Sequence, residues 1–319
     1  MKVEHVKGNT WVLIDWEYIP FYKVDDNRCI LLDTGTYLQR KDLENTLLEL
    51  GLTPVGILGS HAHIDHMGSF GYLQKKYGAT LALTLGEAGQ IYSHLGLHLQ
   101  YSNLPMEDFP KYPELDTAPC LPDRIIMPEE TSVELCGVTF GLVRTPGHTV
   151  DHICIRTPDN VLYLGDAMMT GRTLHRSKFP YAFHMQEYLN SLGKLRTEEA
   201  DLYIVAHQGV YQEILPFIDL ELRFITSRML ELLDLVDGYT TPRLITAAIC
   251  RTYRIHSDSV RTMAYYESAG EKYIQYLTGQ GYLETYVEED QIRYRLTDRA
   301  KERDETVEDD LLPRTGLFR

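Results

Sequence analysis

Cysteine is scarce in this sequence, and the few cysteines present show no pairing pattern. Five are spread over 319 residues, at Cys29, Cys120, Cys136, Cys154 and Cys250. An odd number of scattered cysteines without a C-x-x-C pair argues against a disulfide framework and against a cysteine zinc site. Those at positions 29, 136 and 154 lie among strand-like apolar residues, where reduced cysteine behaves as a small buried hydrophobe. We therefore expect reduced core cysteines.

Long apolar runs and an excess of basic residues are also missing. The N-terminus reads MKVEHVKGNTWVLIDW, with charged residues interleaved among apolar ones, so neither a signal peptide nor a membrane span is predicted. The chain has 31 Lys and Arg against 46 Asp and Glu, a formal net charge of −15. This charge disfavours nucleic acids and anionic membranes as partners. We expect a cytoplasmic protein whose partners are small molecules or proteins.

The first two thirds of the chain alternate between predicted strands and helices. Runs of β-branched and aromatic residues bounded by turn residues predict strands, and apolar residues at helical spacing predict helices. Strands are expected at 10–24, 28–35, 54–60, 80–85, 132–145, 151–157, 160–167 and 200–207, and helices at 41–50, 69–78 and 184–195. Residues 100–123 are rich in proline and acidic side chains, which predicts an irregular excursion that can serve as a lid.

The character of the sequence changes near residue 211. Long helical stretches begin at Glu213, further helices are predicted at 242–253 and 271–281, and residues 281–298 alternate like a β-hairpin with EED at its turn. We therefore predict two domains, residues 1–211 and residues 212–319, the second mainly helical and like a winged helix. Its tail, residues 301–319, is expected to be loose or to depend on a partner for its structure.

The segment HAHIDH carries the densest group of metal-ligand side chains. His61 and His63 are two residues apart, so an extended backbone points both imidazoles toward one metal. Asp65 and His66 can then face a neighbouring site. Imidazole and carboxylate ligands suit zinc and also accept iron or manganese. The alternative, a surface histidine cluster without a ligand role, is disfavoured because this spacing rarely arises by chance.

Three more ligand-type residues each follow a predicted strand. His148 follows FGLVRTPG, Asp166 follows VLYLG and His207 follows LYIVA. A lone residue of this kind is more often structural than metal-binding. Together, however, they complete two ligand sets, which are His61, His63 and His148 for one metal and Asp65, His66 and His207 for the other, with Asp166 as the bridge. We expect two divalent cations, zinc first and iron or manganese as alternatives.

These motifs resemble a known family. SHAHIDH, TPGHT, LGDA and AHQG occur in the order and surroundings of the metallo-β-lactamase superfamily, over roughly residues 10–210. The resemblance implies an α/β fold of the αββα type, two mixed sheets packed face to face with helices outside and the metals at one edge. It also implies a metal-dependent hydrolase. A hydroxide activated by two metals would attack the substrate, with Asp166 holding the metal spacing and Asp65 orienting the hydroxide.

Within this superfamily the stretch TPGHTVDHIC looks closest to glyoxalase II, a thioester hydrolase. Two departures concern the substrate: AMMTGRTLHRSKFPYAF follows Asp166 in place of the glutathione-associated pattern, and the last ligand motif is AHQG in place of the commoner GH form. The leading hypothesis is therefore a hydrolase of small esters or thioesters. The second domain is expected either to close one wall of the pocket or to form a homodimer interface.

Several alternatives stay open at this point. Some superfamily members with a winged helix cleave RNA, but residues 239–299 hold eight basic and eight acidic residues, without the basic excess of a nucleic-acid reader. A persulfide dioxygenase with one iron would not need Asp65, His66 and His207. The same neutral balance disfavours a metal-sensing transcription regulator.

Two further residues and one small basic group are open to two interpretations each. Asp33 either supports a ligand histidine or caps a turn. His152 either supports the site or is a strand residue. The small basic group Arg172, Arg176 and Lys178 either binds an anionic substrate group or forms a solvated loop.

Overall fold

The computed structural model describes residues 1–98, 105, 107, 111, 119–236, 241–303 and 311–313. The chain divides into two compact units, one formed by Met1–Met168 and Glu198–Ile214 and the other by Met169–Thr197 and Leu215–Arg319. The segment 169–197 therefore groups with the C-terminal part of the chain. A boundary between folding domains at residue 211 remains a proposal.

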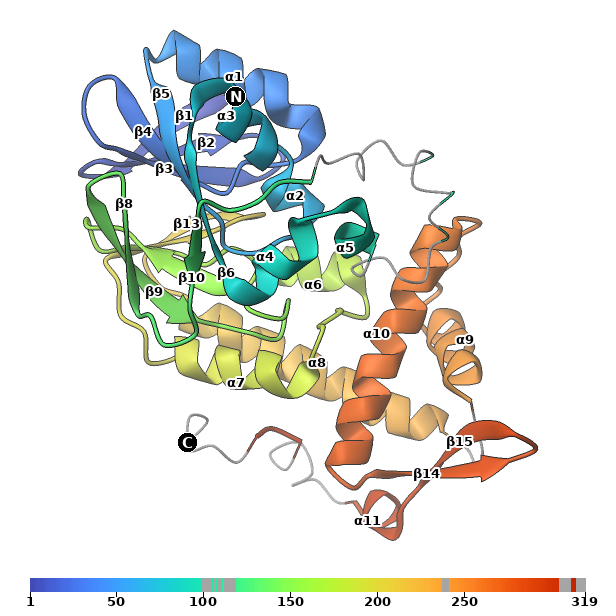
Figure 1. The fold of residues 1–319 in the computed structure, drawn as a ribbon. Coiled ribbons are helices and arrows are strands. Elements are labelled where there is room, and N and C mark those ends of the chain that lie inside the picture. The colour runs from blue at the N-terminus through green and yellow to red at the C-terminus, as the bar shows by residue number, and fades with distance from the viewer. Residues whose placement is uncertain are drawn as a thin grey trace. The chain divides into compact units, whose positions relative to one another are not determined.

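Two β-sheets form the frame of the first unit (Figure 1). The seven-stranded sheet has the order β1-β2-β3-β4-β5-β6-β7, antiparallel from β1 to β4 and parallel from β4 to β7. Its strands are Lys2–Lys7, Thr10–Ile14, Tyr18–Lys23, Arg28–Leu32, Thr53–Leu58, Thr80–Thr84 and Arg124–Ile126. The six-stranded sheet has the order β13-β12-β11-β10-β9-β8. In chain order from β8 to β13, its strands are Ser132–Leu135, Val138–Arg144, Ile153–Arg156, Val161–Tyr163, Leu202–Val205 and Gly209–Tyr211.

Most of these strands were predicted from the sequence, but two of the predicted strands are pairs of strands in the structure. The run predicted at 10–24 is two strands, β2 and β3, joined by a bend at 15–17, and the run at 132–145 is the hairpin β8–β9. The hairpin predicted around TPDN is confirmed as β10–β11. Strands β1, β7 and β13 were not predicted, because each is short or lies outside a clear alternating run.

The two sheets of the first unit share one apolar core. Leu58 of the first sheet and Phe140 and Ile204 of the second belong to the same buried cluster, so the sheets pack face to face. Leu43 and Leu73 belong to a second cluster with the other face of the first sheet. These two leucines lie on α1 (Arg40–Glu49) and α3 (Phe70–Tyr77). Helices therefore cover the outer face of the first sheet.

The strand directions bring five loops of the first unit to one edge. Strand β10 is antiparallel to both β9 and β11, and β12 is parallel to β11, so β9, β11 and β12 run the same way. Their carboxyl ends lead to His148, Asp166 and His207, while the parallel strands β4 and β5 lead to Asp33 and His61. Loops at the carboxyl ends of strands are a common place for a functional site.

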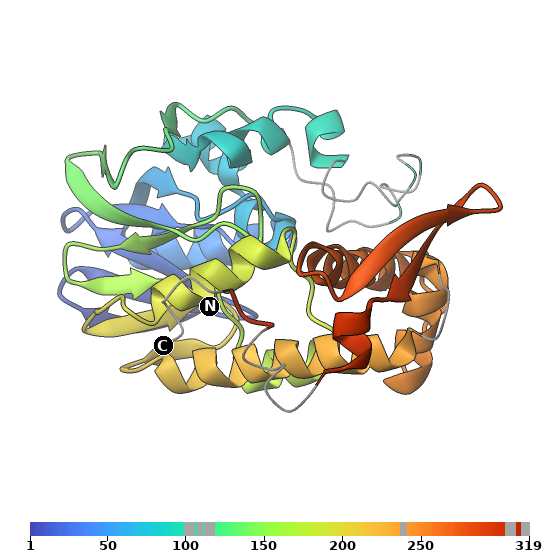
Figure 2. The same ribbon diagram turned by 90° about the horizontal axis from the view of Figure 1, so that it is seen from below.

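The second unit is mainly helical, as the sequence predicted. The β14–β15 hairpin follows α10 and is seen as the red ribbon in Figure 2. The carboxylate of Glu221, buried within this unit, accepts hydrogen bonds from the Tyr188 hydroxyl and the Met169 N–H. The elements are α6 (Gly171–Ser177), α7 (Met185–Leu195), α8 (Leu215–Leu235), α9 (Pro242–Thr252), α10 (Val260–Gly279), β14 (Leu283–Glu288), β15 (Gln291–Leu296) and α11 (Asp298–Lys301).

Some predictions fall outside the described residues. The excursion at 100–123 lies mostly outside them, and so does most of the tail at 301–319. All five cysteines are free, and Cys136 alone among them is half-buried while the others are buried. No helix in the described part of the chain is long and apolar enough to cross a membrane.

Candidate metal centre

The HAHIDH segment leaves the end of β5 and turns into a one-turn helix. His63 has the extended backbone that the sequence predicted, with φ −73° and ψ 148°, and it is the residue directly before α2 (Ile64–Met67). The helix then carries Asp65 and His66 in its single turn. His61 and His66 are both fully buried, so the imidazoles face the protein interior and not a solvated surface.

Three histidines form the first ligand group together with Asp166. The ring nitrogen Nε2 of His61 lies 3.1 Å from Nδ1 of His63, which in turn lies 2.9 Å from Nε2 of His148. An oxygen of Asp166 lies 3.4 Å from Nε2 of His148. Burial holds the pKa of both His61 and His148 well below its usual range. Neutral imidazoles with converging nitrogens are the form that binds a metal.

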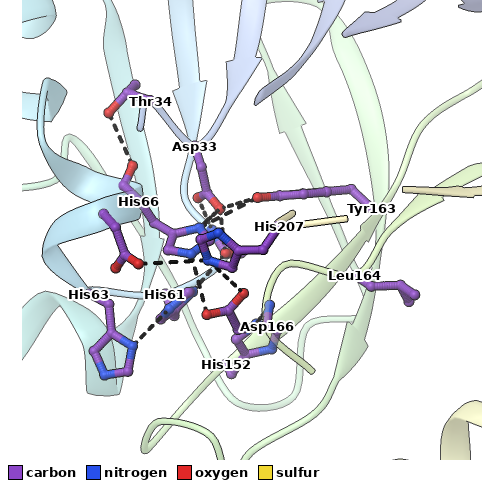
Figure 3. A network of polar contacts seen from close by, with 12 residues as sticks. Asp33, Thr34, His61, His63, His66, His152, Tyr163, Leu164, Asp166 and His207 are labelled. Carbon is purple, nitrogen blue, oxygen red and sulfur yellow. Dashed lines mark hydrogen bonds and ion pairs between the residues drawn. The ribbon is translucent and has the colours of Figure 1, made fainter. Parts of the chain in front are cut away.

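The second group also contacts the Asp166 carboxylate. Its Oδ2 is 3.5 Å from His66 Nε2, and its Oδ1 is 3.4 Å from His207 Nε2. Figure 3 shows the imidazole of His207 and the carboxylate of Asp166 directed toward each other. The carboxylate of Asp65 lies 3.6 Å from His207 Nε2. Although burial alone would raise the pKa of Asp166, His207 and His66 hold it well below its usual range. The structure thus brings all seven predicted ligand residues together.

Asp33 sets the tautomers of two of these histidines. Its Oδ2 accepts hydrogen bonds from His66 Nδ1 at 2.9 Å, Ser60 Oγ at 2.5 Å and the Tyr163 hydroxyl at 2.7 Å. Because Ser60 gives its hydrogen to Asp33, the 2.9 Å contact with His61 is a bond donated by His61 Nδ1. In the neutral form of each ring, Nε2 is therefore the nitrogen that carries the lone pair a metal requires. The supporting role that the sequence suggested for Asp33 is present as a hydrogen bond.

His152 supports Asp166 through the backbone. Its Nε2 accepts the N–H of Asp166 at 3.2 Å, so the neutral ring carries its hydrogen on Nδ1 and donates it to Thr145 Oγ1 at 2.8 Å. Burial lowers the pKa of His152 to about 4, which keeps the ring neutral. Gly165, with φ +51°, lies against this ring, and a Cβ there would come within 2.7 Å of His152 Nε2. Of the two interpretations of His152, these contacts favour the supporting one.

Sequence reasoning missed a buried glutamate that links two ligand loops. Glu87 lies in α4 (Leu85–Ile91), and its Oε2 accepts the N–H of Ala62 at 2.9 Å while its Oε1 accepts the N–H of Asp151 at 2.8 Å. Ala62 separates His61 from His63, and Asp151 belongs to the loop of His148. Burial raises the pKa of Glu87 to about 7. No motif or spacing points to this residue.

The bend between β2 and β3 brings two more unpredicted residues to the centre. The Trp16 ring meets the His207 ring edge-on with centroids 5.0 Å apart, and Trp16 is 54% exposed. Glu17 is buried, and one of its carboxylate oxygens lies with ring nitrogens of His66 and His207 in a group whose atoms are all within 4.8 Å of one another. In the sequence, only the acidic side chain in WEY could have indicated that Glu17 lies at the metal centre.

The basic group proposed after Asp166 belongs to the second unit. Arg172 and Arg176 lie on α6, and Lys178 directly follows it. The Lys178 ammonium donates to the carbonyls of Tyr253 and Arg254 at 3.2 Å. A contact with substrate remains an untested interpretation for these three side chains.

The donor set fits divalent cations. Nε2 of His66 is buried and has no hydrogen-bond partner among the described residues, and a buried polar atom without a partner is costly. Three ring nitrogens of the first group also face one another at 2.9–3.1 Å. A cation gives such lone pairs a common partner, and imidazole with carboxylate suits zinc, iron or manganese.

Comparison with known proteins agrees with this geometry. Residues 9–207 match the family model of the metallo-beta-lactamase superfamily. A curated relative, hydroxyacylglutathione hydrolase GloC of Haemophilus influenzae, is 27% identical over 195 residues, which cover 60% of this chain and 84% of the relative.

Two solved structures share the fold over most of the chain. A metallo-beta-lactamase family protein from Thermus thermophilus has a TM-score of 0.68 at 21% identity, covering 88% of this chain and 94% of its own. A beta-lactamase domain protein from Burkholderia ambifaria has a TM-score of 0.67 at 19% identity, covering 92% and 93%. At these identities the likeness concerns the fold alone, and it confirms the predicted α/β class with a mainly helical C-terminal part. Since the family model spans more than half of the sequence, the chain belongs to the metallo-beta-lactamase superfamily and is an enzyme, a metal-dependent hydrolase.

Proposed function

We propose that this enzyme hydrolyses a small ester or thioester at a centre of two divalent cations, zinc first. The observation that carries the proposal is the convergence of two ligand groups on one carboxylate, with Asp166 oxygens 3.4–3.5 Å from imidazoles of both. The proposed ligands are His61, His63 and His148 in the first group, Asp65, His66 and His207 in the second, and Asp166 in both.

The side chains divide the work of such a reaction among them. Two bound divalent cations supply Lewis-acid activation, which makes a water nucleophilic near neutral pH. Asp166 Oδ2 lies 3.4 Å from His148 and 3.5 Å from His66, and Oδ1 lies 3.4 Å from His207, so this one carboxylate would hold both groups together. Asp65 is partly exposed, with 27% of its side chain accessible, and can accept a hydrogen from the attacking water and orient it. No serine or cysteine nucleophile is required.

An acyl substrate is supported by the relatives. The stretch TPGHTVDHIC resembles glyoxalase II, and the relative from Haemophilus influenzae is named a hydroxyacylglutathione hydrolase. The small size of the substrate agrees with the acidic net charge of −15, which does not favour a polyanion. The winged-helix assignment, the homodimer and the cytoplasmic location stay predictions.

The deciding experiment measures metal content and substrate choice together. Protein purified without added metal is subjected to elemental analysis and assayed on thioester, phosphodiester and β-lactam substrates. Two metals per chain with thioester or ester turnover support the proposal. One iron per chain without hydrolysis indicates the dioxygenase, and phosphodiester cleavage alone indicates the nuclease.

A pair of variants tests the ligand set. Asp166→Ala should lose most of the second metal and the hydrolase activity, because both ligand groups lose their shared carboxylate. Asp201→Ala is the control, since this carboxylate lies in the same unit but pairs with Lys7 at the surface. Retention of metal and activity in Asp166→Ala contradicts the proposed centre.

A further inference from the structure

Glu17 is a buried carboxylate that has no hydrogen-bond partner in the described part of the chain. It lies in the bend between β2 and β3 and is 1% exposed. Neither of its oxygens accepts a hydrogen bond from any residue that the structure describes. Burying a carboxylate without a hydrogen bond or a counter-charge is strongly unfavourable. In this position the side chain is neutralised either by a proton or by a cation.

The position of the carboxylate points to what that partner is. One Glu17 oxygen lies with ring nitrogens of His66 and His207 in a group whose atoms are all within 4.8 Å of one another. His66 donates Nδ1–H to Asp33, so in the neutral ring the nitrogen that faces this group, Nε2, carries a lone pair. A carboxylate beside a lone pair is repulsive unless a proton or a cation lies between them, and a carboxylate oxygen converging with two ring nitrogens is a donor set that a metal ion fits.

The surrounding chain holds Glu17 where it is. The N–H of Tyr18 donates to the carbonyl of Ala206, the residue before His207, and the carbonyl of Glu17 accepts the N–H of Asp15 at 3.0 Å. The carboxylate also packs close to the Cα of Gly35, where a Cβ would lie 3.1 Å from Glu17 Oε1. The side chain is therefore fixed against the centre and does not reach solvent.

We infer that Glu17 is a further ligand of the second metal, in addition to Asp65, His66, His207 and Asp166. This inference rests on the proposed metal centre. It makes the two sites chemically unequal, because the first has three imidazoles and the shared carboxylate, whereas the second has two imidazoles and up to three carboxylates. Oxygen-rich sites suit harder ions such as manganese, so the second site should accept Mn²⁺ more readily than the first.

The test uses the metal-free full chain titrated with Zn²⁺ or Mn²⁺ alone. Binding is followed by calorimetry, and free Mn²⁺ by electron paramagnetic resonance. The wild type should bind two equivalents. Glu17→Gln should keep one equivalent and bind the second at least ~10-fold more weakly, since even partners of ligands typically change metal affinity by that factor. In the metal-free state the variant should melt no lower than the wild type, because an unpaired buried carboxylate has been removed.

Two further variants separate ligation from other roles. Glu17→Met has a side chain of similar length and no ligand oxygen. It should weaken binding of the second metal equivalent as Glu17→Gln does, so the result does not depend on how glutamine alone fits the site. Glu221→Gln is the matched control, because Glu221 is a buried carboxylate of the other unit with hydrogen bonds of its own; it should bind two equivalents like the wild type.

The outcomes distinguish this inference from the proposed function. If the wild type binds two equivalents and Glu17→Gln and Glu17→Met bind both with unchanged affinity, Glu17 is not a ligand while the centre stands. If the wild type binds no second equivalent, or Asp166→Ala still binds two, the proposed centre itself fails.

Discussion

Asp33 and His66 are joined by a buried hydrogen bond of 2.9 Å, in which His66 Nδ1 donates to Asp33 Oδ2. The same oxygen accepts hydrogen bonds from Ser60 and Tyr163. One carboxylate oxygen at the end of β4 therefore fixes the tautomers of two proposed metal ligands that follow β5. Asp33 adopts φ +63°, a left-handed conformation that aspartate and asparagine tolerate better than most residues.

Asp33→Asn tests this arrangement while keeping the backbone conformation. The amide nitrogen or the weaker amide oxygen then faces three donors, so at least one buried bond to a charged acceptor is lost. We expect the free energy of unfolding of the metal-free protein to fall by about 2–3 kcal/mol, measured by urea unfolding. Metal affinity should fall ~10–100-fold, measured by calorimetry.

The control for this variant is Asp33→Gly, which relaxes the positive φ but removes all four side-chain hydrogen bonds, the three at Oδ2 and the one that Oδ1 accepts from the Ser60 N–H. If the loss of stability in Asp33→Asn came from backbone strain at the positive φ, Asp33→Gly would be more stable than Asp33→Asn. An Asp33→Asn protein with wild-type metal affinity contradicts the tautomer argument.

Gly165 and Gly51 offer a matched pair of substitutions. Both have positive φ, +51° and +69°, but a Cβ at Gly165 meets His152 Nε2 at 2.7 Å and Ser60 Oγ at 2.8 Å, whereas a Cβ at Gly51 meets nothing within 4 Å. Gly51→Ala should cost about 1 kcal/mol of stability through backbone strain. Gly165→Ala should cost a further 1–3 kcal/mol or so through the clash.

The clash at Gly165 should also reach the metal centre. His152 accepts the N–H of Asp166, so a displaced ring moves the carboxylate that both ligand groups share. Metal titration should show weaker binding in Gly165→Ala and unchanged binding in Gly51→Ala. Equal loss of stability in the two variants would show that the contact with His152 is easily relieved.

The site residues that are predicted most directly from the sequence are those that lie close together along the chain. His61, His63, Asp65 and His66 are four residues within six positions, a spacing that local geometry turns directly into a cluster. Glu17 and Glu87 lie close to residues that are tens of positions away in the sequence, and no local pattern encodes such contacts. Both became visible only once the sheets had brought their loops together.

The fold shows the same division between local and distant information. Predicted strands with alternating or apolar runs were found, but the helix predicted at 271–281 in fact begins at Val260. Its start has a local signal, because Ser259 caps the helix by accepting the N–H of Thr262. The grouping of residues 169–197 with the C-terminal unit has no local signal, since it depends on tertiary packing.

Glu87 makes the stability of the metal-free protein depend on pH. Its pKa is raised to about 7 by burial, which outweighs the hydrogen bonds from the Ala62 and Asp151 backbone that favour the charged form. Between its ordinary pKa near 4.5 and about 7, the native state keeps a proton that the unfolded state has lost. The free energy of unfolding contributed by Glu87 therefore falls as pH rises through this window and is level above it.

Glu87→Gln isolates this contribution, because a glutamine does not titrate and the other groups cancel in the difference. Urea unfolding of both proteins from pH 4.5 to 8 should show the wild-type advantage shrinking by at most about 3 kcal/mol as pH rises. At pH 8 the variant still has one backbone N–H without its acceptor, so it should not become much more stable than the wild type. A wild-type advantage that grows with pH would show that the two backbone hydrogen bonds outweigh burial and that Glu87 is charged in the folded enzyme.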